Sequence, residues 1–237
     1  MNATEYQTRI NELFDRWKKA QGYTDENFTV DGVAPENWDK WNHSKPKILF
    51  LLKENWGDFE PQDGFTIKGD FEGHFFTWNI ARWRHLIQTL FSDFSADVQP
   101  DDFHAKFPIV VEDCALVEAK KINEAQGTSS NIQIYEYVVK DKAYLKEQLD
   151  LLDPQIILCC YTENAYRQRL RLNDHYPELI KKSNCGCYKD GNRLVIDFYH
   201  PSVREGHTRS VELFEILKFM IKEGRVFEHF DWGKKPD

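Results

Sequence analysis

Residues 47–58 read KILFLLKENWGD, a run of apolar side chains that ends abruptly in charged and amide side chains. From Ile48 to Leu52 every residue is apolar, which is typical of a strand buried on both faces of a parallel sheet. Short apolar runs of the same kind predict three more strands, at residues 114–117, 155–160 and 193–198. Helical periodicity predicts five helices, at residues 4–20, 75–91, 130–152, 162–172 and 208–222.

Strands that alternate with helices of this length predict a three-layer α/β/α sandwich around a central, mostly parallel four-stranded sheet. Ser130 begins an S-x-x-Q capping-box pattern at the start of the longest helix. We expect a single α/β domain over residues 1–237. It divides into an N-terminal helix and irregular arm (1–46), a core (47–222) and a C-terminal tail (223–237).

Composition excludes several classes of protein. The chain has 237 residues, 41% of them hydrophobic, and a net charge of −8, so it can bury a core and does not coat nucleic acid through bulk positive charge. Its longest apolar run is strand-sized and its N-terminus is polar, so we expect no membrane association and no secretory signal. Five cysteines without a C-x-x-C motif predict a cytoplasmic protein without a disulfide framework, metal or cofactor. A monomer is the expected state.

The charge is unevenly distributed along the chain. Residues 161–210 contain nine Lys and Arg against six Asp and Glu, a net charge of +3, which leaves −11 for the other 187 residues. This pattern is consistent with a local basic face that binds DNA weakly through few phosphates. It is equally consistent with a solvated helix face.

The carboxyl ends of parallel strands are where ligands bind in sheets of this type. After the first predicted strand come Glu54, Asn55 and Asp58, which could hold and activate a water molecule, or could simply be solvated loop residues. After the last predicted strand comes His200, whose backbone the following proline restricts. Ser202 and Arg204 follow it and could donate hydrogen bonds to a phosphate.

The second predicted strand leads into a segment that suits an anionic ligand. Glu118 and Lys120 lie at its end, and Ser129 and Ser130 open the following helix, where hydroxyl groups and backbone amides converge. No Walker or dinucleotide-binding fingerprint is present, so a nucleotide cofactor is not expected. Cys160 beside His200 could form a nucleophilic pair, but adjacent strand cysteines are more commonly core residues.

The first and last strand ends resemble those of the uracil-DNA glycosylase superfamily. The resemblance covers residues 45–222 and depends on His-Pro-Ser at 200–202 and on LKENWGD at 52–58. The latter lacks the Gln-Asp-Pro-Tyr or Asn-Pro-Gly core and is similar to bacterial members that read L-K-E. The resemblance implies an asparagine at position 118, where this chain has Glu118. An ionised glutamate only accepts hydrogen bonds, whereas uracil requires both a donor and an acceptor.

The resemblance implies that the protein hydrolyses the N-glycosidic bond of a damaged or deaminated base flipped out of DNA. Neutral His200 would stabilise the departing base anion, and Glu54 would hold the water, with Asn55 or Asp58 as substitutes. Ser202, Ser129 or Ser130 would contact phosphates and Arg204 would enter the duplex, while Phe59, Phe65 or Phe71 would stack on the base. Two alternatives remain. One is a non-catalytic relative that binds nucleic acid or a nucleotide, and the other is an unrelated small-molecule hydrolase.

Overall fold

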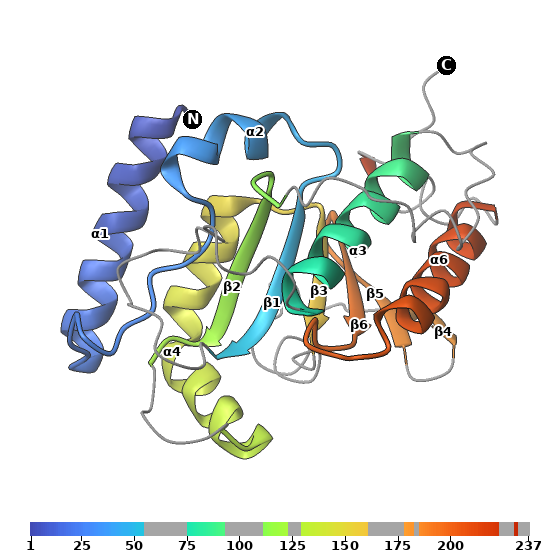
Figure 1. Ribbon diagram of the computed structural model, residues 1–237. Coiled ribbons are helices and arrows are strands. Elements are labelled where there is room, and N and C mark those ends of the chain that lie inside the picture. Colours follow the sequence, from blue (N-terminus) through green and yellow to red (C-terminus); the bar gives the residue numbers. More distant parts are fainter. Residues whose placement is uncertain are drawn as a thin grey trace.

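A six-stranded sheet forms the centre of the protein (Figure 1). The computed structural model describes residues 1–54, 75–92, 111–122, 129–160, 178–182, 185–222 and 230–231. In the described residues the strand order is β2-β1-β3-β6-β5-β4. The strands are β1 (Ile48–Glu54), β2 (Cys114–Lys120), β3 (Ile156–Cys160), β4 (Glu178–Lys182), β5 (Cys185–Asp190) and β6 (Arg193–Phe198).

The four predicted strands are confirmed, and they form the parallel part of the sheet, in the order β2, β1, β3, β6. The prediction of only four strands is wrong, because β5 pairs antiparallel with β6 and β4 pairs antiparallel with β5. These two strands have the sequences ELIKK and CGCYKD, which contain charged residues and a glycine in place of a continuous apolar run. They therefore lack the pattern by which buried strands are recognised.

The helices cover both faces of this sheet. They are α1 (Ala3–Gln21), the 3-10 helix η1 (Pro35–Asn37), α2 (Trp38–His43), α3 (Phe75–Ser92), α4 (Asn131–Leu152) and α6 (Gly206–Lys222). The predicted helices at 4–20, 75–91, 130–152 and 208–222 are thus confirmed to within two residues at each end. The helix predicted at 162–172 lies outside the described residues. The arm predicted to be irregular contains η1 and α2, and its Trp38 and Trp41 are buried as expected.

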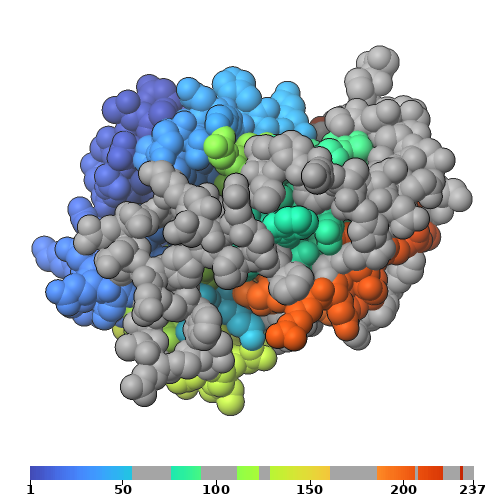
Figure 2. Space-filling view, in the orientation of Figure 1, coloured from blue at the N-terminus to red at the C-terminus, as the bar shows by residue number. Residues whose placement is uncertain are grey.

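Two hydrophobic clusters lie on opposite faces of the sheet, because successive side chains of a strand point to opposite sides. Ile48, Phe50 and Leu52 of β1 pack in the cluster of α3 and α6. Leu49 and Leu51 pack in the cluster of α1, α2 and α4. The described part of the chain is therefore a three-layer α/β/α arrangement, as predicted. At the surface, α1 and α6 lie at opposite sides of the molecule (Figure 2).

The N-terminal arm covers the edge strand β2. Gly32 exchanges two backbone hydrogen bonds with Leu116, with N···O distances of 2.7 and 3.0 Å. Beside it the buried Asp31 carboxylate pairs with the ammonium group of Lys121 and accepts hydrogen bonds from the Gln148 amide and the Glu118 backbone N–H, both at 2.7 Å. These contacts satisfy part of the hydrogen-bonding edge that β2 would otherwise expose.

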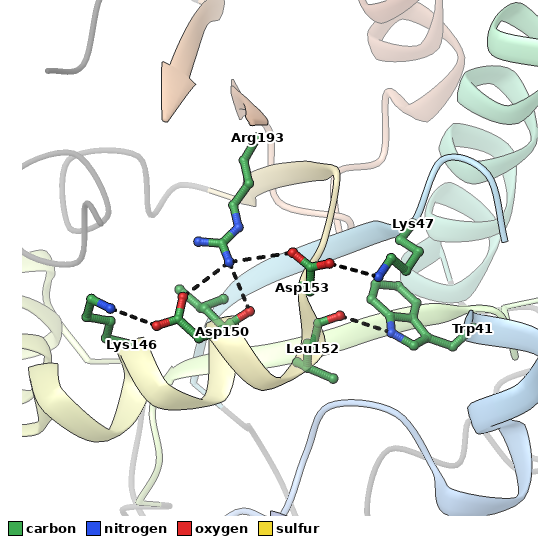
Figure 3. Close-up of polar contacts among 8 residues, drawn as sticks. Trp41, Lys47, Lys146, Asp150, Leu152, Asp153 and Arg193 are labelled. Atoms are coloured by element: carbon green, nitrogen blue, oxygen red, sulfur yellow. Dashed lines mark hydrogen bonds and ion pairs between the residues drawn. The ribbon is translucent and has the colours of Figure 1, made fainter. Parts of the chain in front are cut away.

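A polar network joins the amino ends of the strands (Figure 3). Arg193, at the start of β6, donates to Asp150 at 3.2 Å and lies 4.0 Å from Asp153. Asp153 also pairs with Lys47, just before β1, at 3.3 Å. All of these residues lie at the end of α4 or at the start of a strand, so the network connects secondary structure elements far from the strands' carboxyl ends.

Candidate functional site

The carboxylate of Glu54 is held at the carboxyl ends of β1 and β2. Glu54 pairs in register with Lys120, whose Nζ lies 2.9 Å from Glu54 Oε2. The Ser129 hydroxyl donates to the same oxygen at 2.5 Å, and the Ser129 backbone N–H donates to Oε1. Figure 1 shows the first part of α4 extending past the arrowheads of β1 and β2. Two strands and a helix start therefore converge on one carboxylate.

These contacts leave Glu54 able to accept one further hydrogen bond. A carboxylate has about four lone-pair sites, and three donors occupy sites on Glu54. Its side chain is 7% exposed, whereas that of Lys120 is fully buried. The remaining site suits a donor such as a water molecule. Lys120 was expected to contact an anionic ligand, and within the described part of the chain it contacts the Glu54 carboxylate.

The two serines before α4 have different partners. Ser129 uses its hydroxyl proton on Glu54 and accepts from Lys120 Nζ at 2.7 Å, so this proton is not available to a phosphate. Ser130 is the N-cap of α4 and forms the predicted capping box with Gln133. The Ser130 hydroxyl still has its own proton to donate, because in the box it accepts from the Gln133 backbone N–H.

His200 follows β6 and its ring is held by Ser202. The Ser202 backbone N–H donates to His200 Nδ1 at 3.3 Å, and the Ser202 hydroxyl lies 2.8 Å from the same atom. Because a backbone N–H can only donate, Nδ1 is an acceptor and the neutral ring carries its proton on Nε2. Burial, with a smaller contribution from Lys53, lowers the pKa of His200 to about 4. At neutral pH this residue is therefore an uncharged hydrogen-bond donor.

His200 and Glu54 lie at the same edge of the sheet, with β3 between their strands. Two strand spacings of about 4.8 Å place the ends of β1 and β6 about 10 Å apart. The Lys53 ammonium group donates to Asn131 Oδ1 at 2.9 Å and also interacts electrostatically with His200. The first and last strand ends therefore lie close enough to contribute to one site.

Glu118 is buried in the same region, with 2% of its surface exposed. Its Oε2 atom is buried and has no hydrogen-bond partner among the described residues. Burial is the main cause that raises the pKa of Glu118 well above its ordinary value, and Asp31 and Glu54 raise it further. The raised pKa makes the protonated acid of Glu118 more accessible than that of an ordinary, ionised glutamate. A protonated carboxyl both donates and accepts, as an amide does.

The remaining predicted residues are exposed, buried in the core or outside the described residues. Arg204 is exposed on the loop between β6 and α6. The other predictions at this edge fall outside the described residues, namely Asn55, Asp58, Phe59, Phe65 and Phe71. Cys160 is buried, and burial raises the pKa of its thiol well above the ordinary value, which disfavours the reactive thiolate.

Among the described residues, no group of three or more His, Cys, Asp or Glu side chains could hold a metal ion. None of the helices in those ranges is both long and apolar enough to cross a membrane.

Sequence reasoning missed Asn79, which connects α3 to the loop of His200. Its amide Nδ2 donates to the carbonyl oxygens of Pro201 at 2.6 Å and Val203 at 2.9 Å. One signal could have found it, because Asn79 is a polar residue beside Ile80 and Trp83 on the apolar side of a predicted helix. A buried amide requires hydrogen-bond partners, and a polar residue among core positions therefore marks a contact.

The sequence matches no protein-family model and no curated protein.

Proposed function

We propose that this protein is a uracil-DNA glycosylase-like enzyme that hydrolyses the N-glycosidic bond of a damaged or deaminated base flipped out of DNA. The observation that carries the proposal is that a neutral donor, His200, and a carboxylate, Glu54, lie at the same end of the parallel strands. Cleavage of this bond needs these two functions, because the departing base becomes an anion while the sugar develops positive charge.

His200 suits the departing base. Its pKa of about 4 means that the ring is uncharged at neutral pH, and its proton is on Nε2. It can therefore donate a hydrogen bond from Nε2 but has no second proton to transfer. A fixed donor aimed at developing negative charge stabilises the transition state, as the donors of an oxyanion hole do. Ser202 contributes by orienting the ring.

Glu54 suits the water and the sugar. Lys120 and Ser129 fix its carboxylate, which leaves one acceptor site for a water molecule. The same negative charge would stabilise a positively charged sugar. Because three donors hold the Glu54 carboxylate in place, its role is to orient the water and to stabilise charge.

In this proposal Glu118 recognises the base. Its protonated acid would offer a donor and an acceptor side by side, the combination that a neighbouring carbonyl and N–H on a base require. The unpartnered Oε2 supports this role, because a buried polar atom without a partner costs free energy that a ligand can recover. With Glu118 protonated, the difference from asparagine at this position no longer counts against recognition of such an edge.

Release of free base from oligonucleotides that contain modified bases tests the proposal. The wild-type protein should release at least one base from a panel of deaminated and alkylated bases in single- and double-stranded DNA. His200→Ala and Glu54→Gln should lower the rate by at least about 100-fold, in the range of single catalytic groups. Arg193→Met, at the opposite edge of the sheet, is the matched control and should keep the wild-type rate. A folded protein that releases no base from the whole panel would overturn the proposal.

A second candidate is a non-catalytic relative that binds nucleic acid or a nucleotide. The observation that favours it is the extent to which Lys120 and Ser129 already satisfy Glu54, which suits a structural carboxylate as well as a catalytic one. DNA binding that weakens with salt, without base release, would select this candidate over the enzyme.

A further inference from the structure

A buried side chain from another layer of the protein holds the loop that follows β6, residues 199–205. Asn79 belongs to α3 and is 2% exposed. Its amide nitrogen donates to Pro201 O at 2.6 Å and to Val203 O at 2.9 Å, so both of its protons are used on one turn of the loop. A side chain that bonds two carbonyls of the same turn fixes both the position and the tilt of that turn.

Two hydrogen bonds and a proline make this turn rigid. The Asn79 amide therefore moves or holds the turn as one unit. The Val203 backbone N–H donates to the His200 carbonyl at 3.1 Å and closes the turn. Ser202 bonds His200 Nδ1 from within it. Pro201 has a fixed φ, which removes one of the remaining backbone rotations. Moving the carbonyls of Pro201 and Val203 therefore moves the imidazole.

Helix α3 is a firm support for this amide. Trp83, one turn after Asn79, is fully buried and packs edge-on against Phe198 of β6 with ring centroids 4.8 Å apart. Phe76, one turn before Asn79, places its ring 5.9 Å from the His200 ring. The face of α3 that carries Asn79 thus contacts β6 on one side and the loop of His200 on the other.

We infer that Asn79 is the positioning residue of the candidate site, which holds His200 in the partly buried location where it acts as a donor. The inference deepens the proposed function, since it assigns the support of the proposed catalytic histidine. It concerns the geometry of His200, however, and can be tested without any substrate. Asn79 itself does not reach the reacting atoms.

The chain offers a matched control in Gln88, on the same helix. The Gln88 amide also donates two hydrogen bonds, to Ser44 Oγ at 3.1 Å and Asp113 Oδ2 at 2.9 Å. These partners lie away from the loop of His200. Removing either amide from α3 costs the protein two hydrogen bonds, but only the loss of Asn79 should release the catalytic loop.

The test is an NMR titration of the His200 imidazole in the full chain, with the resonance assigned by its loss in His200→Gln. In the wild type the ring should titrate near pH 4. In Asn79→Leu the loop should loosen and admit water, which raises the midpoint by at least one pH unit toward the ordinary value of about 6.5. In Gln88→Leu the midpoint should stay near 4. Asn79→Ser, which is smaller and keeps one donor, should give an intermediate midpoint and covers the case in which the leucine variant does not fold.

Two results would overturn the inference. One is a midpoint near 4 in a folded Asn79 variant, and the other is an equal rise in Gln88→Leu, which would mark a general loosening of the protein. Base release measured in parallel should fall at least tenfold in the Asn79 variants and stay at the wild-type level in Gln88→Leu. If the wild type releases no base, the proposed enzyme fails, while the titration still decides the role of Asn79.

Discussion

At the scale of single residues, the candidate site depends on which side chains carry charge. Lys120 and Glu54 are buried together, so each compensates the other, and the Ser129 hydroxyl bridges them. Glu118 lies nearby without such a partner, and burial raises the pKa of its carboxyl. When two neighbouring carboxyl groups have different environments, their pKa values differ and the two groups can take different roles.

The lowered pKa of His200 predicts how both activity and stability respond to acid. The ring is neutral in the folded protein down to a pH of about 4, so base release should not lose this donor between pH 8 and pH 5. An unfolded histidine takes up a proton near pH 6.5, and the unfolded chain therefore binds more protons between pH 6.5 and 4. Stability should fall as the pH drops through this window.

Urea unfolding of the wild type and of His200→Asn at pH 7 and pH 5 measures this effect. The loss of unfolding free energy between the two values should be about 1–2 kcal/mol smaller in the variant, because the variant lacks the titrating group. Equal losses in the two proteins would show that His200 is not protected from protonation.

At the scale of secondary structure elements, the start of α4 performs two tasks within two residues. Ser130 caps the helix through a reciprocal pair of bonds with Gln133, and Ser129 places its backbone N–H and hydroxyl on Glu54. The cap fixes where the helix begins, and this in turn fixes where Ser129 lies. The capping box can be predicted from local sequence. It supports a site whose contacts cannot be predicted in that way.

Removing the cap should therefore affect stability and the site together. Ser130→Ala should lower the unfolding free energy by about 1 kcal/mol, the usual cost of losing an N-cap side chain. Thr8→Ala, which removes an exposed hydroxyl inside α1 that bonds the carbonyl of Thr4, should change it by less than about 0.5 kcal/mol. Chemical denaturation of both variants provides the comparison. Equal effects would mean that the capping box adds nothing.

At the scale of the whole molecule, the N-terminal segment is joined to the core by a buried ion pair as well as by apolar packing. Asp31 and Lys121 have fully buried side chains, and Asp31 also accepts from Gln148 and from the backbone of β2. Lys121 immediately follows Lys120 at the end of β2. Lys121 binds Asp31 of the arm, and Lys120 binds Glu54. The arm and the candidate site therefore share one strand end.

Breaking the buried pair should strongly destabilise the protein. Asp31→Leu leaves the Lys121 ammonium buried without its partner and should cost about 3–5 kcal/mol of unfolding free energy. The double variant Asp31→Leu with Lys121→Met should recover part of this loss. Arg16→Ala removes an exposed ion pair between α1 and α4 and should change the unfolding free energy far less. Urea unfolding of the four proteins checks the order, and a small effect of Asp31→Leu alone would contradict it.

Local patterns in the sequence were sufficient for the strands and helices that have one strong signal. The run from Ile48 to Leu52 predicts a strand buried on both faces, and the Ser130 pattern predicts the start of α4, because both signals arise from residues close together in the chain. Strands β4 and β5 carry charged residues and a glycine, so their pairing depends on neighbours that no short window contains.

The sequence by itself determined the layered architecture, the carboxyl edge of the sheet as the place for a site, and Glu54 and His200 as residues at that edge. Only the tertiary structure decided what these residues can do. The partners of Glu54 come from β2 and from the start of α4, and the amide that holds the turn of His200 comes from α3. Protonation depends on burial, and burial depends on contacts between residues distant in sequence, which is why only the fold shows that the pKa of Glu118 is raised.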